Sequence, residues 1–526
     1  MSGAAHGHEG EQPRRWLVLL AMTGSLSMIF VDMTVVGIAL PSIGGALHMT
    51  EAQQTWIVTS YLLALASAVA LGGRLGDLLG KVPAFIAGVA GFAGASLLCG
   101  FAQDGTTLLA GRVLQGLSAC LMQPASMALV VGAFAPGERG KAMAMYVGIP
   151  LLFMAVGPVL GGLVVEWVGW RWIFWINLPI AAVAMVLTQV ARPRDARSHD
   201  RAIDWPGGVL LVTGLPLFVY GLQETGTVRA DGEVSFGESR TLAALLVGAA
   251  LLGFFIRRQW TIERPLLRLR LFSDRAIFAA AFIIGCMQFA MTGLVIAGSV
   301  YAQEVLGYEP ARAGASLLPM LAPVILVVHV AGRWYDRAGV RAPVSWGTAL
   351  CTVGLLVQAL GVWQQQYPTM AVGMAILGTG IAFTMSPTNT DALSRVPHAD
   401  RGQVSGLVQT LRQVGGSVGV ALIAASVAVA QHQLERSEAS IAHSDLVAVR
   451  EALRSKDAQA HERALQHPQL AQMRSIVAGS FAVGYVVAAL GTAAAFVVAR
   501  RMLPRGHAHG HAPGTHHRPP VTPDVG

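Results

Sequence analysis

The sequence predicts an all-α polytopic membrane protein with fourteen transmembrane helices, arranged as two six-helix bundles plus an inserted pair of helices. Three observations support this fold class. Of the 526 residues, 54% are hydrophobic and 13% are charged, which is about half the charged fraction of an ordinary soluble domain. Apolar runs of bilayer length recur along the chain, and a short motif with an acid between glycines occurs once in each half. No separate soluble domain is expected.

Apolar runs of about 18 residues or more place the helices, because this length crosses a bilayer. The N-terminal bundle, residues 16–190, is expected to hold helices near 16–40, 56–73, 82–101, 106–132, 142–166 and 172–190. The inserted pair, residues 206–256, has helices near 206–222 and 241–256. The C-terminal bundle, residues 276–499, has helices near 276–300, 313–332, 343–363, 368–388, 403–430 and 475–499. Helices 1–6 then correspond to helices 9–14.

The distribution of positive charge predicts the orientation. Of the 37 Lys and Arg residues, 25 fall in loops and tails on the side of the N-terminus, and such residues mark the cytoplasmic side of a membrane protein. We therefore expect a multi-pass membrane protein with both tails, residues 1–15 and 500–526, in the cytoplasm. The first apolar run is too long for a signal peptide, so it should stay in the mature protein. The net charge of +8 reflects this orientation better than a nucleic-acid partner.

An acid inside the first helix is the strongest functional signal. Asp32 is the only Asp, Glu, Lys or Arg between Arg15 and Glu51, and an unpaired charge at this depth costs roughly 2.5–3.5 kcal/mol on insertion scales. Such acids commonly mark ion or substrate paths, and the alternative is an acid that serves packing alone in a polar seam. With a rise of about 1.5 Å per residue, Arg112 in the fourth helix lies at a similar depth. We therefore expect the two side chains to couple across a central cavity.

The repeated motif follows the second and the tenth helix. Residues 73–80, Gly-Arg-Leu-Gly-Asp-Leu-Leu-Gly, match residues 332–339, Gly-Arg-Trp-Tyr-Asp-Arg-Ala-Gly. Asp77 can accept hydrogen bonds from the N-terminus of a facing helix, where the helix dipole favours an anion. Such a contact would hold the cytoplasmic side shut, with Asp336 as its counterpart in the second half. The alternative is an ordinary solvated loop acid.

Small residues and polar side chains within the helices suggest close packing and a substrate cavity. Gly157 and Gly161 have small-xxx-small spacing, which lets the fifth helix approach a neighbour. Gln409, Arg412 and Gln413 share a helix face, which either binds polar groups of a substrate or forms a structural polar network. Apolar and methionine side chains suit a promiscuous site, although they are also ordinary core residues. The further cavity candidates, chosen by position, are Met122, Gln123, Phe153, Met154, Gln288 and Met291.

Several features bear on partners and cofactors. The four cysteines lie in apolar segments without metal-ligand spacing, so neither a disulfide nor a metal site is expected. The His-rich tail is either disordered or a loose metal binder. The polar segment 431–474 is either a helical excursion on the outer face, open to a periplasmic adaptor, or a linker. No phosphate-binding loop for ATP and no nucleophile or metal constellation appears, which argues against an enzyme.

Taken together and in order, the motifs resemble the major facilitator superfamily, and within it the fourteen-helix drug:proton antiporter branch. The stretch 73–81 resembles the cytoplasmic gating motif, although Leu78 and Val82 stand where basic residues are usual. Residues 108–116 resemble the fourth-helix motif, which implies a role for Arg112 in proton transfer. The gating residues that this resemblance assigns are Gly73, Asp77, Gly80 and Lys81.

Three further stretches carry the resemblance. Gly157-Pro158-x-x-Gly161-Gly162 is similar to the fifth-helix motif of antiporters, although Phe153 stands where that family usually has a glycine. Residues 32–41 resemble the first-helix signature of the fourteen-helix branch, with a glycine at position 37 in place of a common asparagine. Residues 171–179 and 401–406 also resemble that branch.

The resemblance implies a proton-coupled antiporter that exports lipophilic, often cationic, drugs or toxic small molecules by alternating access. The proton gradient would supply the energy, without a cofactor or ATP, and membrane lipid would surround the helices. A cationic substrate would compete with a proton for Asp32. Two alternatives remain open: an exporter of one metabolite or siderophore, and a metal-ion exporter or sensor that uses the His-rich tails.

Overall fold

The computed structural model describes residues 12–134, 138–193, 203–225, 238–396, 401–437 and 470–505. Within these ranges, thirteen helical segments are long and apolar enough to cross a membrane. The helix α5 (Arg139–Trp167) adds a fourteenth crossing. The predicted fold class is therefore confirmed. The predictions for most of segment 431–474 and for the histidines of the tail fall outside the described residues.

The N-terminal half contains seven helices in six crossings. They are α1 (Gln12–Leu47), α2 (Glu51–Leu79), α3 (Lys81–Phe101), α4 (Gly105–Ala133), α5, α6 (Trp172–Trp175) and α7 (Asn177–Ala191). The first helix is longer than expected because α1 continues through Pro41. Proline is tolerated inside a membrane helix where neighbouring groups satisfy the freed backbone carbonyl. The single helix expected at 172–190 is instead divided into α6 and α7.

The rest of the chain forms the inserted pair and the C-terminal half. The inserted pair consists of α8 (Trp205–Glu224) and α9 (Ser239–Thr261), followed by the short 3-10 helix η2 (Leu269–Ser273). The C-terminal half contains α10 (Arg275–Glu304), α11 (Pro310–Ala315), α12 (Leu318–Ala338), α13 (Arg341–Trp363), α14 (Tyr367–Ser394), α15 (Arg401–Ser437) and α18 (Leu470–Met502). The expected helix 313–332 is divided because a proline lies at the start of both α11 and α12, where its fixed backbone angle begins a helix.

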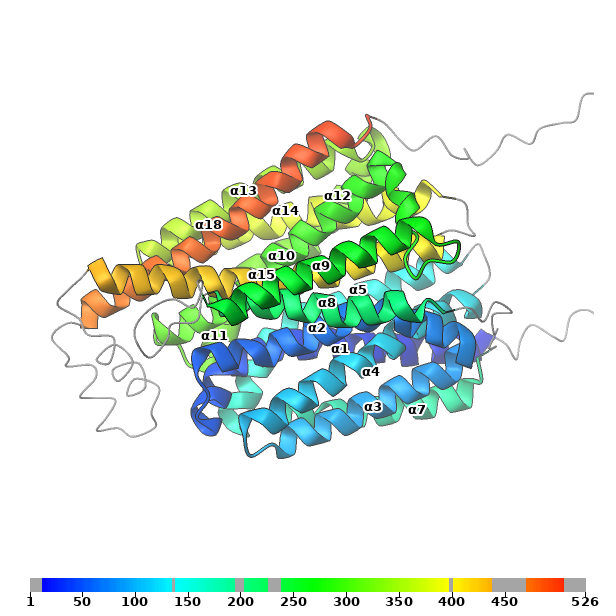
Figure 1. Cartoon of the computed structure of the whole chain (residues 1–526), viewed down its shortest axis with the longest axis horizontal. Helices are drawn as coiled ribbons and strands as arrows, with labels where there is room; N and C mark the ends of the chain where they lie inside the picture. Colours follow the sequence, from blue (N-terminus) through cyan, green and yellow to red (C-terminus); the bar gives the residue numbers. More distant parts are fainter. Residues whose placement is uncertain are drawn as a thin grey trace, which may run out of the picture.

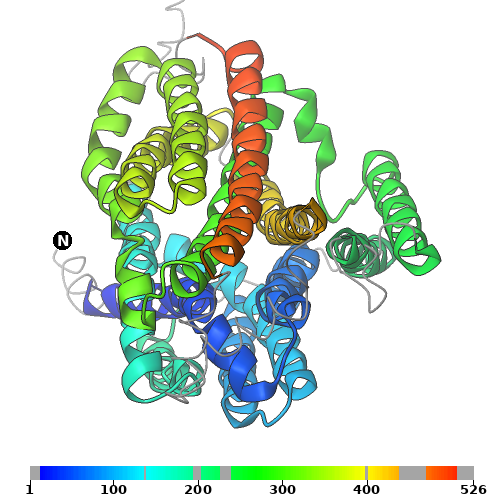
Figure 2. The same cartoon turned by 90° about the vertical axis from the view of Figure 1, so that its left-hand side faces the viewer.

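The crossings run roughly parallel, and α1 begins and α18 ends toward the right of Figure 1. We call this the terminal end and the opposite end, where α1 ends and α2 begins, the loop end. Viewed along the bundle, the N-terminal half in blue and cyan lies below the C-terminal half in green to red (Figure 2). The pair α8 and α9 lies to one side, where α8 packs against both α2 and α15. The inserted pair therefore covers one seam between the halves.

One buried acid connects the two helices of the inserted pair. Asp204 caps α8 by accepting from the backbone N–H of Gly207 at 3.0 Å. It also accepts from Arg258 Nε at 2.8 Å and from Gln259 Nε2 at 2.7 Å, both on α9. Burial raises the pKa of Asp204, but these hydrogen bonds outweigh that effect and the pKa lies below its ordinary value. A single carboxylate thus holds α8 and α9 together at the terminal end.

The two halves meet closely near the loop end through α5 and α11. A Cβ at Gly162 would collide with the carbonyl of Pro310, and a Cβ at Gly314 would collide with the carbonyl of Pro158. The helices α1 and α10 also meet there, since Ser299 Oγ donates to the carbonyl of Gly37 at 2.8 Å. Through these contacts the two halves pack against each other at the loop end.

Candidate functional site

A buried ion pair joins α1 and α4. Arg112 Nη1 donates to Asp32 Oδ2 at 2.6 Å, and both side chains have 0% exposure. A charge-assisted hydrogen bond of this length is among the stronger polar contacts in proteins. The structure therefore brings together the two residues that the depth estimate placed at similar height.

A polar network holds the guanidinium in place. Arg112 Nε donates to the carbonyl of Ile57 on α2 at 2.9 Å, and Nη1 donates to Gln115 Oε1 at 2.7 Å. Gln115 Nε2 donates in turn to Ser96 Oγ on α3 at 2.8 Å, and Asn177 Nδ2 of α7 donates to the same oxygen at 3.3 Å. Five helices of the N-terminal half thus converge on one charged pair.

An aromatic ring and an unsatisfied donor complete this environment. The guanidinium carbon of Arg112 lies 4.4 Å from the ring centroid of Tyr61, within the range of a cation–π contact. Arg112 Nη2 and Tyr61 Oη are buried without a hydrogen-bond partner. A buried polar atom in that state costs about 1–3 kcal/mol. Two hydrogen-bonding atoms of this network thus lack partners in this conformation, which favours a rearrangement of the side chains in another conformation.

The location of the pair corrects one expectation. Asp32 was expected to meet Arg112 across a cavity between helices, but both side chains are fully buried and the pair lies inside the N-terminal half. Helix rise predicts depth but not the direction in which a side chain points. The face of α1 that meets the other half is marked by Gly37 and Ile38, whose carbonyls accept from α10. Asp32 precedes Gly37 by five residues, which is about 7 Å along the axis and about 140° around it, so Asp32 points into the N-terminal half and away from the face that meets α10.

The gating motif forms a tight turn between α2 and α3. Gly80 has φ 106° and ψ 145°, a conformation that side chains other than glycine rarely adopt. Asp77 is contacted by Lys81, and Arg74 Nη1 lies 3.8 Å from Asp77 Oδ2. Gly73 packs near Pro124 of α4, where a Cβ would lie at 3.6 Å. The described ion pairs of Asp77 are thus local, and its contact with a facing helix N-terminus stays a prediction for another conformation.

The second copy of the motif also ends its helix at a glycine with positive φ. Gly339, the counterpart of Gly80, has φ 74° and ends α12. Asp336 is exposed at this end of α12. Nearby on α14, Arg395 donates to both carboxylate oxygens of Asp391 at 2.6 and 3.0 Å, and Asp391 is fully buried. Sequence reasoning missed this pair, although an acid and an arginine at i, i+4 directly after an apolar run were a usable signal.

The fifth-helix motif has two functional faces. A Cβ at Gly157 would collide with Thr34 Oγ1, and a Cβ at Gly161 would lie 2.6 Å from Val35 Cγ1. This face therefore packs tightly on α1, two or three residues from Asp32. The other face, with Pro158 and Gly162, meets α11 of the opposite half. The glycines are needed for close approach on both sides of α5.

The cavity candidates have different surroundings. Met122 is fully buried against Gly88 of α3, and Met291 lies in the core of the C-terminal half, so both serve packing in this conformation. Phe153 is 46% exposed, and the side chain of Met154 lies outside the described part of the chain. Gln288 Nε2 donates to a threonine one turn further along α10.

Three polar candidates have partly unsatisfied or buried groups. Gln123 Oε1 and Arg412 Nε are buried without a hydrogen-bond partner. Gln413 is buried and lies one residue beyond Arg412, whereas Gln409 is partly exposed. Among the described residues, no three His, Cys, Asp or Glu side chains are grouped as metal ligands would be.

The fold and this site define a class of protein. Two six-helix halves that meet at one end, with a buried charged pair inside one of them, have the architecture of a membrane transporter whose halves rock about a central site. The family model described as Major Facilitator Superfamily matches residues 22–420. The chain belongs to this superfamily.

Similar proteins with curated names are bacterial. The chain is 34% identical over 432 residues to the tetracenomycin C resistance and export protein of Streptomyces glaucescens, covering 80% of this chain and 78% of that protein. It is 33% identical over 422 residues to a puromycin resistance protein of Streptomyces alboniger, covering 79% of this chain and 82% of the relative. It is 32% identical over 400 residues to a multidrug resistance protein B homolog of Mycobacterium tuberculosis, covering 75% and 73%.

Solved structures share the fold at low sequence identity. A bacterial homolog of the human lysosomal transporter Spinster, in an inward-facing and unoccupied conformation, has a TM-score of 0.62 at 14% identity and covers 93% of this chain and 98% of its own. An auto-inhibited peptide transporter of the POT family has a TM-score of 0.60 at 15% identity and covers 95% and 99%.

Proposed function

We propose that this protein is a proton-coupled efflux antiporter of the fourteen-helix drug:proton branch, which exports lipophilic, often cationic, drugs. The observation that carries the proposal is the buried Asp32–Arg112 pair, whose acid lies on α1, the helix that also contacts α10 of the other half at Gly37. Relatives named for puromycin resistance, tetracenomycin C export and multidrug resistance support the substrate class. The fourteen crossings support the branch.

The pair can couple a proton to a change of conformation. Two opposite charges about 4 Å apart attract by about 4 kcal/mol at an effective dielectric constant of about 20. A proton on Asp32 cancels this attraction, while Ile57 and Gln115 still hold Arg112. The first helix then loses its charged attachment to α4, and α1 is the helix that contacts α10 of the other half. Proton binding and the closure of the seam thus act on the same helix.

We also propose that both termini face the cytoplasm of a bacterial inner membrane, since the positive residues concentrate in the loops and tails of the terminal end. The loop end, which is closed in this structure, then faces outward. Substrate enters from the cytoplasmic side, leaves when the halves rock, and is exchanged for a proton. No cofactor and no catalytic step are needed. Cysteine labelling of each end in intact cells and in everted vesicles tests the orientation.

Transport in everted vesicles tests the proposed function. Vesicles that contain the full chain should take up ethidium or puromycin when a pH gradient is imposed. This uptake should stop when the gradient is collapsed. Uptake that ignores the gradient would refute proton coupling. Gradient-driven uptake of a metal ion or of one metabolite, without these drugs, would instead support the alternatives.

A further inference from the structure

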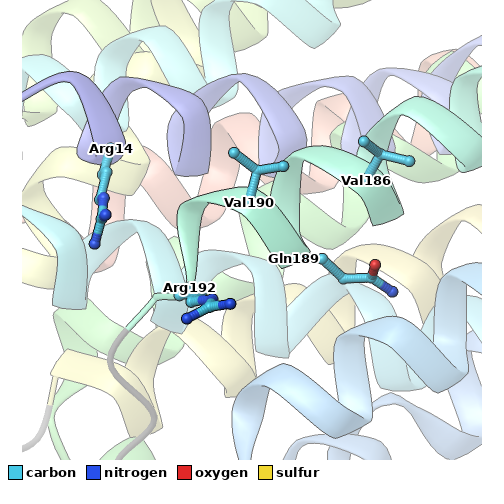
Figure 3. A pocket seen from close by; sticks show the side chains of 5 residues that line it. All are labelled: Arg14, Val186, Gln189, Val190 and Arg192. Carbon is cyan, nitrogen blue, oxygen red and sulfur yellow. The ribbon is translucent and has the colours of Figure 1, made fainter.

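We propose that a surface groove between α1 and α7 at the terminal end is a binding site for an anionic phospholipid. Figure 3 shows a pocket of about 470 Å³ that is lined by Arg14, Val186, Gln189, Val190 and Arg192. It lies at the ends of the helices, on the outside of the N-terminal half, apart from the Asp32–Arg112 pair. Its two arginines, one amide and two valines combine the polar and apolar contacts that a lipid headgroup and its acyl chains require.

The positive charges of the pocket favour the binding of an anion. Arg14 is exposed in the first turn of α1 and its side chain extends toward the end of α7, which Arg192 follows directly (Figure 3). No acid within the described residues forms an ion pair with either arginine. The neighbouring Arg15 differs, since its Nη1 lies 2.5 Å from Glu138 Oε2. Both arginines line the same hollow, and a phosphate group bound there can accept charge-assisted hydrogen bonds from guanidinium groups.

The depth of the pocket and its apolar wall select a lipid over free phosphate. Arg192 comes one residue after the end of α7, and Arg14 comes two residues before Trp16, an aromatic side chain of the kind found at membrane interfaces. Both arginines therefore lie at headgroup level. From Arg192 toward the membrane interior, α7 presents Val190 and Val186, which are 58% and 57% exposed. These valines continue the pocket as a strip against which an acyl chain packs.

Lipid binding to the purified full-length protein tests the site by native mass spectrometry. Phosphatidylglycerol is compared with phosphatidylcholine of the same acyl chains, so that only the headgroup differs. The wild type should bind phosphatidylglycerol about tenfold more tightly, and the double variant Arg14→Gln, Arg192→Gln should lose this difference. The Arg14→Lys, Arg192→Lys variant should keep most of it, because the charge remains.

A matched control removes the same number of charges from the same end of the molecule. The variant Arg501→Gln, Arg505→Gln changes two exposed arginines, one in the last turn of α18 and one three residues after its end, and should retain the wild-type preference. Equal affinities for the two lipids in the wild type, or an unchanged preference in the Arg14/Arg192 variant, would overturn the proposal. Displacement of the lipid by inorganic phosphate would show an anion site without the acyl-chain contact, and would also overturn it. Only variants that elute as the wild type does in size-exclusion chromatography are compared.

Discussion

Replacement of Asp32 by asparagine separates the charge of this side chain from its shape. The variant keeps an oxygen that can accept from Arg112 Nη1, but it removes the countercharge of a guanidinium with 0% exposure. The lost attraction is about 4 kcal/mol at a charge separation of about 4 Å and an effective dielectric constant of about 20. Removing one partner of a buried pair typically costs 3–5 kcal/mol, in agreement with this figure. We therefore expect both a less stable protein and a loss of proton coupling.

A second variant distinguishes these two effects. In Asp32→Asn, Arg112→Gln the charge imbalance disappears, so thermal stability in detergent should recover by about 2–4 kcal/mol relative to Asp32→Asn. Proton coupling should not recover, because neither variant has a carboxylate at position 32. The assay is drug uptake into everted vesicles after a pH jump, compared with drug binding at equal pH.

The outcome that refutes this reasoning is specific. If Asp32→Asn retains the wild-type rate of gradient-driven uptake, the carboxylate does not carry the proton. If the coupling energy between positions 32 and 112 is below about 0.5 kcal/mol, the two side chains act independently, and the proposed link between proton binding and α1 fails as well.

Three further predictions follow from other contacts. Asp204→Asn should lower the stability of the α8–α9 pair by about 2 kcal/mol, less than for a fully buried pair because Arg258 is 36% exposed. The pKa of Asp204 is held below its ordinary value, so the stabilisation by its carboxylate is present at neutral pH and is lost as the pH falls below about 4. The melting curves of wild type and variant should therefore converge in acid. Gly162→Ala should disfavour closure of the loop end by about 1–3 kcal/mol, seen as faster labelling of a cysteine placed there; unchanged labelling would argue against the α5–α11 contact. Gln115→Leu should destabilise the protein by about 1–3 kcal/mol, since Ser96 and Arg112 each lose a partner; an unchanged melting temperature would contradict the network.

The number of crossings was predictable because the bilayer imposes one length on every helix. The ends of the helices were less predictable. The apolar run placed the first helix near 16–40, but α1 continues through Pro41 to Leu47. Within a packed helix bundle, neighbouring groups can satisfy the backbone that proline leaves free, and a single sequence does not reveal those neighbours.

The functional residues were predictable where their chemistry is unusual for a membrane. The cost of a charge in a membrane helix marks Asp32 and Arg112 as functional candidates, and the family resemblance of residues 108–116 pointed to Arg112 for proton transfer. Their partners were not predictable in the same way. Ser96 and Tyr61 are common residue types in membrane helices, and only the packing of α2, α3 and α4 shows that Tyr61 lies against the guanidinium and that Ser96 accepts from Gln115.

The two-sided packing of α5 determines which parts of the molecule move as one piece. On one side, the absence of side chains at Gly157 and Gly161 lets α5 pack closely on α1. We therefore expect α5 and α1, which carries Asp32, to move together. On the other side, the contact of Pro158 and Gly162 with α11 is backbone against backbone, which can separate without the repacking of long side chains. In the mechanism proposed above, separation of α5 from α11 would move Asp32 together with α5, so that proton release and opening of the loop end would occur in one movement.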